Sequence, residues 1–306
     1  MKAALVWAFA TIAGATPAAA QQIPMGGPGA DDCQLRIDAP SGNWIIDGYD
    51  PFGNDTPTAS YDLMFRNEGG RECRFYPLFE TDGTPLGLSG EAGDRRIAYT
   101  LVDVSDNYDA TPIAGRTIRN RTHRPVIVAP HSQQLVRYLF SVDTNAIPGD
   151  GLFSQRLVVD AEGLDGQPLG NRQLLLGIRV LPSAVMGLAG AFHRDHGQAD
   201  VDLGELAEGV PAVPLQLQVH STRRYKLQLA SLNNGKLRLS GTDWTVPYQM
   251  MVDGKQVPFG SAAVFGVAGR SGMRLDTLPV AFHVGNVDGR RAGTYSDTVT
   301  ITISVD

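Results

Sequence analysis

The chain has 306 residues, of which 35 are Gly and 19 are Pro, and its formal net charge is −6 at pH 7. The charged residues are spread without long runs of one sign, so nucleic acid and anionic membrane surfaces are poor partners for this acidic chain. The many Gly and Pro residues favour short strands joined by turns over long helices.

The amino terminus has the layout of a secretory signal peptide. Lys2 precedes an apolar run that ends in small residues before Gln21. We therefore expect residues 1–20 to be removed during export through the periplasm, and residues 21–31 to form a flexible tail. No other apolar run reaches the roughly 18 residues of a spanning helix, so we expect no membrane span. The remaining chain is long enough for two domains of ordinary size.

The two cysteines, Cys33 and Cys73, lie in the first half of the chain. In an exported protein the default expectation is one disulfide, which here would close a loop of about forty residues and stabilise the fold by roughly 3–4 kcal/mol. Two thiols without nearby histidines supply too few ligands for a metal ion. We therefore expect a disulfide and no metal site.

Apolar residues alternate with polar residues along nearly the whole chain. The runs over 174–180 and 299–305 show this pattern, which is typical of half-buried strands. Asn234-Gly235 and Asp253-Gly254 lie between such runs, where tight hairpins require left-handed backbone. The sequence contains no convincing amphipathic helix, so the predicted fold class is all-β.

The two halves of the chain match each other in order, which indicates a diverged tandem duplication. Short runs with similar residue types recur at similar spacing. The matched segments are 86–90 with 237–241, 97–101 with 246–250, 140–142 with 282–284, and 151–157 with 293–299.

The two copies differ in their last strand. The first copy continues through a hairpin into a strand over 172–181, for which the second copy has no counterpart. We therefore expect tandem immunoglobulin-like β-sandwich domains over 32–182 and 183–306, the second lacking its last strand. Such an edge exposes backbone groups and core, and it recruits other chains. We expect one wall of the resulting groove to consist of Tyr295, Val299, Ile301, Ile303 and Val305.

Several motifs resemble the spore coat protein U domain. They are Tyr49-Asp-Pro-Phe52, Tyr61-Asp-Leu-Met-Phe-Arg-Asn67 followed by Cys73, Leu227–Leu237, and Ala292–Ile301 with its Gly-Thr-Tyr-Ser-Asp-Thr run. The resemblance covers nearly the whole mature chain and implies a pilin-type fold in a subunit of an archaic chaperone–usher pilus. It also implies three partners: a periplasmic chaperone, an outer-membrane usher, and the donor strand of the next pilus subunit, which completes the fold by donor-strand complementation.

The amino-terminal tail differs from that of an ordinary shaft subunit. Its Pro and Gly residues, with only Ile23 and Met25 as apolar anchors, make a poor donor strand. A subunit that accepts a strand without donating one stands first in the fibre. The resemblance adds that two-domain subunits of this family are similar in layout to tip adhesins and that such pili promote attachment and biofilm formation, so it implies a tip adhesin at the cell surface. The alternatives are a non-adhesive structural or adaptor subunit and a secreted β-sandwich binding protein.

No motif supports an enzyme or a cofactor. The sequence contains no Gly-x-Ser-x-Gly elbow, and His193 and His196 have no visible third ligand. A Ser–His–Asp triad assembled in space stays open as an alternative. We expect no catalytic site and no cofactor. Trp44, Tyr49 and Phe52 are expected in the core, with a carbohydrate platform as the alternative.

Strand direction predicts where adhesion occurs. The last strand of the first domain must end beside the second domain, so the hairpin over 163–170 lies at the far pole, together with the connections over 66–72 and 107–124. We expect an exposed apolar cluster there that adheres to apolar or abiotic surfaces. The alternative is that these side chains fold back onto the sandwich. The members of the cluster would be Tyr108, Pro112, Ile113, Leu164, Pro168 and Leu169.

Overall fold

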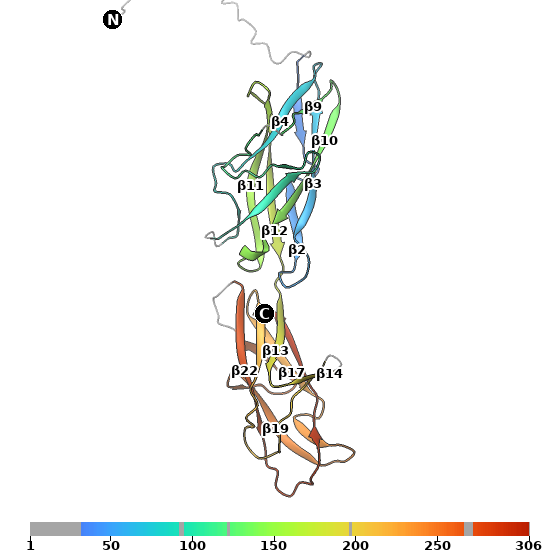
Figure 1. Cartoon of the computed structure of the whole chain (residues 1–306), viewed down its shortest axis with the longest axis vertical. Coiled ribbons are helices and arrows are strands. Elements are labelled where there is room, and N and C mark those ends of the chain that lie inside the picture. The colour runs from blue at the N-terminus through green and yellow to red at the C-terminus, as the bar shows by residue number, and fades with distance from the viewer. Residues whose placement is uncertain (1–31, 92–94, 121–122, 196–197, 266–271, 306) are drawn as a thin grey trace, which may run out of the picture.

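The computed structural model describes residues 32–91, 95–120, 123–195, 198–265 and 272–305. Segments in which apolar and polar residues alternate form strands throughout these ranges. Within these ranges the only helical element is the 3-10 turn Thr144–Ala146, and no helix has the length and apolarity of a membrane span. The predicted signal peptide and tail lie outside the described residues. The fold is all-β, and the strands form two β-sandwich units placed end to end (Figure 1).

The first unit is a sandwich of two sheets, with a core of alternate inward-facing side chains. One sheet has the order β1 (Leu35–Asp38), β3 (Thr58–Asn67), β10 (Gln133–Val142), β7 (Tyr99–Asp103) and β8 (Tyr108–Asp109). The other has the order β2 (Asn43–Tyr49), β12 (Pro168–Val180), β11 (Gly151–Gly163), β4 (Cys73–Glu80) and β9 (Val126–Val128), with β5 (Leu88–Ser89) and β6 (Arg96–Ile97) beside β11.

Aromatic side chains fill the core of the first unit. Trp44 is 1% exposed and stacks on Tyr61 with ring centroids 5.1 Å apart. Tyr49 is also buried in the same core cluster, because the strand is irregular at left-handed Gly48 and turns this ring inward as well. Burial removes Trp44 and Tyr49 from the surface, so they do not form the carbohydrate platform considered as the alternative.

The predicted disulfide joins Cys33 to Cys73 in the structure, with Cα atoms 5.2 Å apart. It ties the segment before β1 to the first residue of β4, and so links the two sheets of the first unit. Cys73 is buried.

The second unit repeats this arrangement. One sheet has the order β13 (Ala184–Gly190), β16 (Leu215–Ser221), β22 (Arg274–Val284), β19 (Thr245–Val252), β18 (Lys236–Leu239) and β23 (Tyr295–Ser296), with β20 (Lys255–Gln256) beside β19. The other has the order β21 (Ala262–Phe265), β17 (Tyr225–Ser231) and β24 (Val299–Val305). A short hairpin of β14 (His193–Asp195) and β15 (Gln198–Asp200) stands apart.

A polar contact, buried in the first unit and part-buried in the second, recurs at matched positions and supports the duplication. In the first unit Tyr99 Oη donates to Gln155 Oε1 over 3.0 Å. In the second, Tyr248 Oη donates to Asp297 Oδ2 over 2.7 Å. The two pairs occupy the same places in the matched segments 97–101 with 246–250 and 151–157 with 293–299. The second unit therefore carries a carboxylate where the first has a neutral amide.

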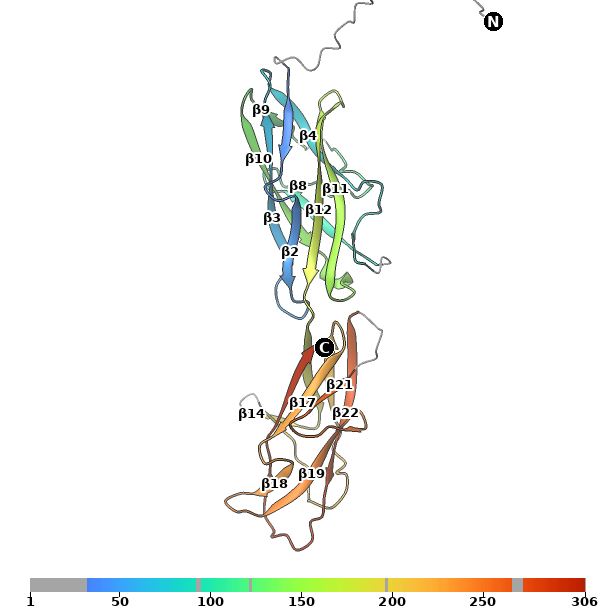
Figure 2. The ribbon, with the colours of Figure 1, turned by 180° about the vertical axis from the view of Figure 1, so that it is seen from behind.

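The two units meet through specific contacts at their joint (Figures 1 and 2). Asp150, at the end of the β10–β11 connection, forms an ion pair with Arg223. In the same connection the carbonyl of Pro148 accepts a hydrogen bond from the backbone N–H of Met273 over 2.7 Å. The ring of Phe52 meets the edge of the His220 ring. The assignment of residues 32–182 to a tip domain and 183–306 to a pilin domain stays a prediction.

Removal of the disulfide should destabilise the first unit alone. The double variant Cys33→Ser, Cys73→Ser opens a loop with a sequence separation of 40 residues. We expect the free energy of unfolding of the first unit to fall by roughly 3–4 kcal/mol. Denaturant titration can resolve this, with near-ultraviolet circular dichroism following the aromatic core of the first unit. A fall of similar size in the transition of the second unit would contradict the prediction.

Candidate functional site

The open edge of β24 distinguishes the second unit from the first. In the first unit β11 lies between β4 and β12, and it pairs with β12 over nearly its whole length. Its counterpart β24 pairs with β17, from Val299 opposite Ser231 to Val305 opposite Tyr225. Within the described residues no strand lies on the other side of β24. One row of its backbone N–H and C=O groups therefore has no sheet partner.

Burial along β24 reflects the same difference. Leu157, Val159 and Ala161 on β11 are 0% exposed, whereas their counterparts on β24 are only half-buried. These counterparts are Val299, Ile301 and Ile303, which pack from one side against the core of the second unit. Val305 continues this face and is also half-buried. The four residues predicted on β24 thus share one apolar face, which is incompletely covered.

Tyr295 does not extend this edge as predicted. Tyr295 belongs to β23, which ends at Ser296 and is separate from β24. Strand β23 pairs with β18 in the other sheet of the second unit. Asp297 occupies the break, where its carboxylate accepts bonds from Tyr248 Oη and from the backbone N–H of Asn233 over 3.0 Å. Burial and this carboxylate raise the pKa of Tyr248. Tyr295 packs with a smaller cluster around Tyr248.

Strand β13 supplies a second wall that the sequence analysis missed. Ala184, Met186 and Leu188 alternate along it, are half-buried, and pack against the same core cluster as Val299, Ile301 and Ile303. Figures 1 and 2 show β13 and β24 running side by side. The alternation of apolar residues over Ala184–Gly190 could have predicted a strand with one inward face, but it did not show that this strand would lie next to β24. We call the two sets together the acceptor face.

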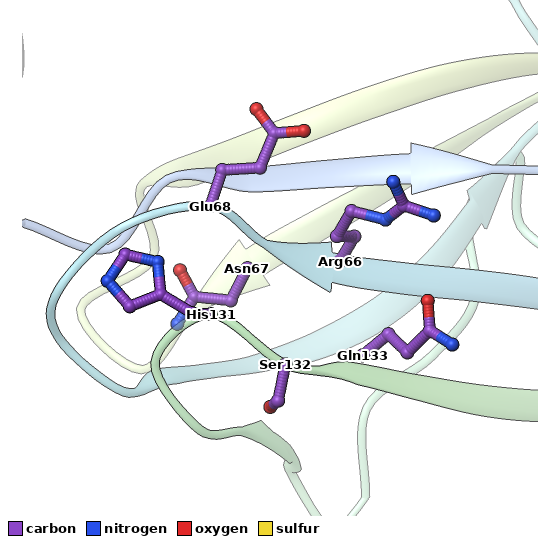
Figure 3. A pocket seen from close by; sticks show the side chains of 6 residues that line it. All are labelled: Arg66, Asn67, Glu68, His131, Ser132 and Gln133. Carbon is purple, nitrogen blue, oxygen red and sulfur yellow. The ribbon is translucent and has the colours of Figure 1, made fainter.

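The pole of the first unit that points away from the second carries a shallow polar hollow (Figure 3). It has a volume of 460 Å³ and is lined by Arg66, Asn67, Glu68, His131, Ser132 and Gln133. Asn67 holds the loops around it, because its amide donates to the carbonyls of Arg71 and Ala129 over 2.6 and 3.2 Å. The β3–β4 connection therefore lies at the far pole, as predicted, and the bonds of Asn67 fix its shape (Figure 1).

Two of the residues predicted at the exposed apolar cluster lie at the far pole and are exposed. Leu164, in the β11–β12 hairpin, is 53% exposed, and Pro168 at the start of β12 is exposed as well. Figure 1 shows this hairpin at the end of the molecule opposite the second unit. Leu169 is half-buried and packs on the core, so the exposure expected for it is wrong.

The exposure expected for Tyr108 and Pro112 is also wrong. Tyr108 is 5% exposed because its ring stacks on His123, with centroids 3.8 Å apart. Pro112 is buried because the preceding Thr111 is tied to β7, its hydroxyl accepting a hydrogen bond from the backbone N–H of Leu101. This connection folds back onto the sandwich.

Ile113 is exposed but lies along the flank rather than at the pole. It is 62% exposed. The backbone of nearby Arg116 forms a β-bridge with Glu80, and Glu80 is paired with Val158 in the middle of β11. This segment therefore lies halfway along the sandwich. The predicted cluster is therefore split, with Leu164 and Pro168 at the pole and Ile113 on the side.

His123 anchors the returning connection. It is 7% exposed, it lies between the rings of Tyr108 and Tyr76, and its Nδ1 has no hydrogen-bond partner among the described residues. Burial, with a smaller contribution from Arg119, lowers its pKa below 6.5, against the opposing effect of Asp106. The described residues contain no cluster of three or more His, Cys, Asp or Glu side chains that could hold a metal ion.

No family model matches the chain, and no curated protein matches it. The resemblance to the spore coat protein U domain therefore stays a prediction. Among solved structures, the chain is similar to one in the CsuC–CsuE chaperone–tip adhesion subunit complex from archaic chaperone–usher Csu pili of Acinetobacter baumannii. The identity is 12%, 88% of this chain and 99% of that chain are covered, and the TM-score is 0.45.

Two other solved structures show weaker similarity. The CupB6 tip adhesin from Pseudomonas aeruginosa is 11% identical, with 89% of this chain and 96% of that chain covered and a TM-score of 0.34. CfaE, the adhesive subunit of CFA/I fimbria of enterotoxigenic Escherichia coli, is 11% identical, with 91% and 83% covered and a TM-score of 0.32.

Acid should destabilise the first unit through His123. Because the folded state holds the pKa of this imidazole below 6.5, the unfolded chain binds the proton more readily, and stability falls as the pH drops through and below 6.5. The variant His123→Phe keeps an aromatic ring in the stack and should flatten this dependence. The matched control is His131→Phe, because His131 is exposed. Thermal melts between about pH 7.5 and pH 5 measure how the melting temperature of the first unit depends on pH. If His123→Phe showed the same pH dependence as the wild type, the prediction would be wrong.

Proposed function

We propose that this chain is the tip subunit of an archaic chaperone–usher pilus, an exported adhesin without enzymatic activity. The observation that carries the proposal is the acceptor face. Strand β24 offers one unpaired row of backbone groups beside half-buried Val299, Ile301 and Ile303, at the position that β12 covers in the first unit. A donor strand from the next pilus subunit fits this position.

The energetics favour such a strand. Four inward apolar side chains on a donor strand, each worth roughly 1.5–3 kcal/mol of burial, would cover the acceptor face, and the ordering of the strand would consume part of that gain. New backbone hydrogen bonds along β24 would add specificity for an extended segment. Before assembly the same edge needs protection. We therefore infer that a periplasmic chaperone is its first partner and that an outer-membrane usher is where the chaperone is exchanged for the donor strand.

The first unit supports a position at the tip. Its corresponding edge is already closed, because β12 pairs with β11 and β2 pairs in parallel with β12. It therefore needs no donor, and its far pole is the end of the molecule opposite the second unit, which carries the acceptor face (Figure 2). We assign surface attachment, and with it biofilm formation, to the far pole of this unit.

A donor strand supplied in cis should stabilise the second unit. We would append a flexible linker and an alternating apolar strand, copied from the amino terminus of a pilus subunit of the same bacterium, after Asp306. A net gain of roughly 2–3 kcal/mol corresponds to a rise in melting temperature of about 10 °C for a unit of this size. Scanning calorimetry of the full chain measures it.

The control carries the same extension with its inward apolar residues changed to Asp. Because charged side chains cannot enter the acceptor face without a large desolvation cost, this extension should leave the transition unchanged. The variant Ile301→Asp, with the intact extension, should likewise lose the gain. Equal melting temperatures with and without the apolar extension would refute the proposed function.

Attachment should depend on the exposed hairpin at the far pole. Replacing Leu164 by Asp removes an apolar side chain that is 53% exposed in the free protein and available to a surface. We expect adhesion of assembled pili to an apolar abiotic surface to fall about tenfold, because the burial of one Leu is worth roughly 1.5–3 kcal/mol. Ile113→Asp on the flank is the matched control and should change adhesion much less. Equal adhesion by wild-type and Leu164→Asp pili, at equal pilus number, would overturn the assignment.

A further inference from the structure

The joint between the two units shows how one sandwich follows another in this molecule. Strand β12 runs antiparallel to β11, and Val180 near its end pairs with Gly151 at the beginning of β11. After residues 181–183 the chain enters β13 of the second unit. The strand that completes the first sandwich therefore leads directly into the next one, beside the loop over 143–150.

That loop makes several contacts of the joint, in addition to the contact between the rings of Phe52 and His220. Asp150 forms its ion pair with Arg223, and the Pro148 carbonyl accepts from Met273 N. Gly149 packs closely on the backbone of Gly272, where an added Cβ atom would lie 2.9 Å from the Cα atom. The first unit thus contacts the second through this loop, with its ion pair, and through the ring of Phe52.

The second unit carries the counterpart of this loop at its free pole. The matched ends of β10 and β22, Val142 and Val284, and the matched residues Gly151 and Gly293 enclose loops of equal length, 143–150 and 285–292. Figures 1 and 2 show the loop between β22 and β23 at the end of the molecule farthest from the first unit. A donor strand with the register of β12 would end beside Gly293, next to this loop.

The net charge of the second loop, +1 from Asp288, Arg290 and Arg291, is opposite in sign to that of the first, −2 from Asp143 and Asp150. Position by position, Arg290 and Arg291 stand where the first loop has Pro148 and Gly149, and the uncharged Ala292 stands in the place of Asp150. Both arginines are exposed. Arg291 lies 5.7 Å from the ring centroid of Trp244, which is itself 36% exposed, and Arg290 forms no ion pair among the described residues.

We propose that the loop 285–292 is a docking surface for the body of the pilus subunit that donates the strand to β24, and that the docking face of this subunit is acidic. The inference rests on the proposed function. Charge complementarity favours a different subunit over a second copy of this chain, since a second copy seated like the second unit would place Arg223 against Arg290 and Arg291. The donor strand and the loop would then be held by one partner at two adjoining places.

The experiment compares the full chain with a charge-reversed variant, Arg290→Glu with Arg291→Glu. The probes are a chaperone-bound pilus subunit of the producing bacterium and a synthetic peptide of its amino-terminal segment. For the wild type we expect the complex with the whole subunit to dissociate about tenfold more slowly than the complex with the peptide, and to lose this advantage at high salt. The charge-reversed variant should bind the peptide as the wild type does and the whole subunit about tenfold more weakly.

A second variant matches the change in net charge at a distance from the loop. Arg95→Glu with Arg124→Glu reverses two exposed arginines on the first unit, and it should behave as the wild type with both probes. Equal losses in the two charge-reversed variants, or no loss in Arg290→Glu with Arg291→Glu, would overturn the docking surface while leaving strand acceptance intact. Failure of the peptide to bind the wild-type chain would overturn the proposed function and the docking surface together.

Discussion

The free backbone edge of β24 is the constraint on which the rest of this molecule depends. A row of unpaired N–H and C=O groups beside half-covered apolar side chains is costly in water and invites pairing with any extended chain. The first unit removes the same cost internally, by adding β12 and β2 to the sheet. In the second unit no strand of the described residues does so, and under the proposed function a strand of another subunit would complete its sheet.

Because the two units are copies of one ancestral unit, the closed edge of the first can be compared position by position with the open edge of the second. The Tyr99–Gln155 and Tyr248–Asp297 contacts mark the same place in both. In the first unit Gln155 lies within a continuous β11, and its amide also donates to the carbonyl of Pro85. In the second, Asp297 only accepts, and the strand is interrupted beside it. A change from amide to carboxylate thus accompanies the break between β23 and β24.

Features that depend on local periodicity were predictable from the sequence. Alternation along 299–305 identified the strand and its inward face, and two cysteines in a chain with a predicted signal peptide identified the disulfide. Features that depend on long-range contact were not predictable. Tyr108 and Pro112 belong to a connection that returns to the sandwich through His123, and neither composition nor spacing encodes that return. Likewise the alternation in β13 revealed a strand but not its position opposite β24.

The continuity of β12 into the second unit has a mechanical consequence. A pull on the second unit enters the first through Val180 and, if the hairpin at the far pole is held, runs along β12 to Pro168. Because β12 is one continuous strand between these two points, its covalent backbone carries the tension, and the hydrogen bonds between β11 and β12 lie outside the load path. A molecule held at this hairpin would therefore transmit tension to the joint without separating the strands of the first unit.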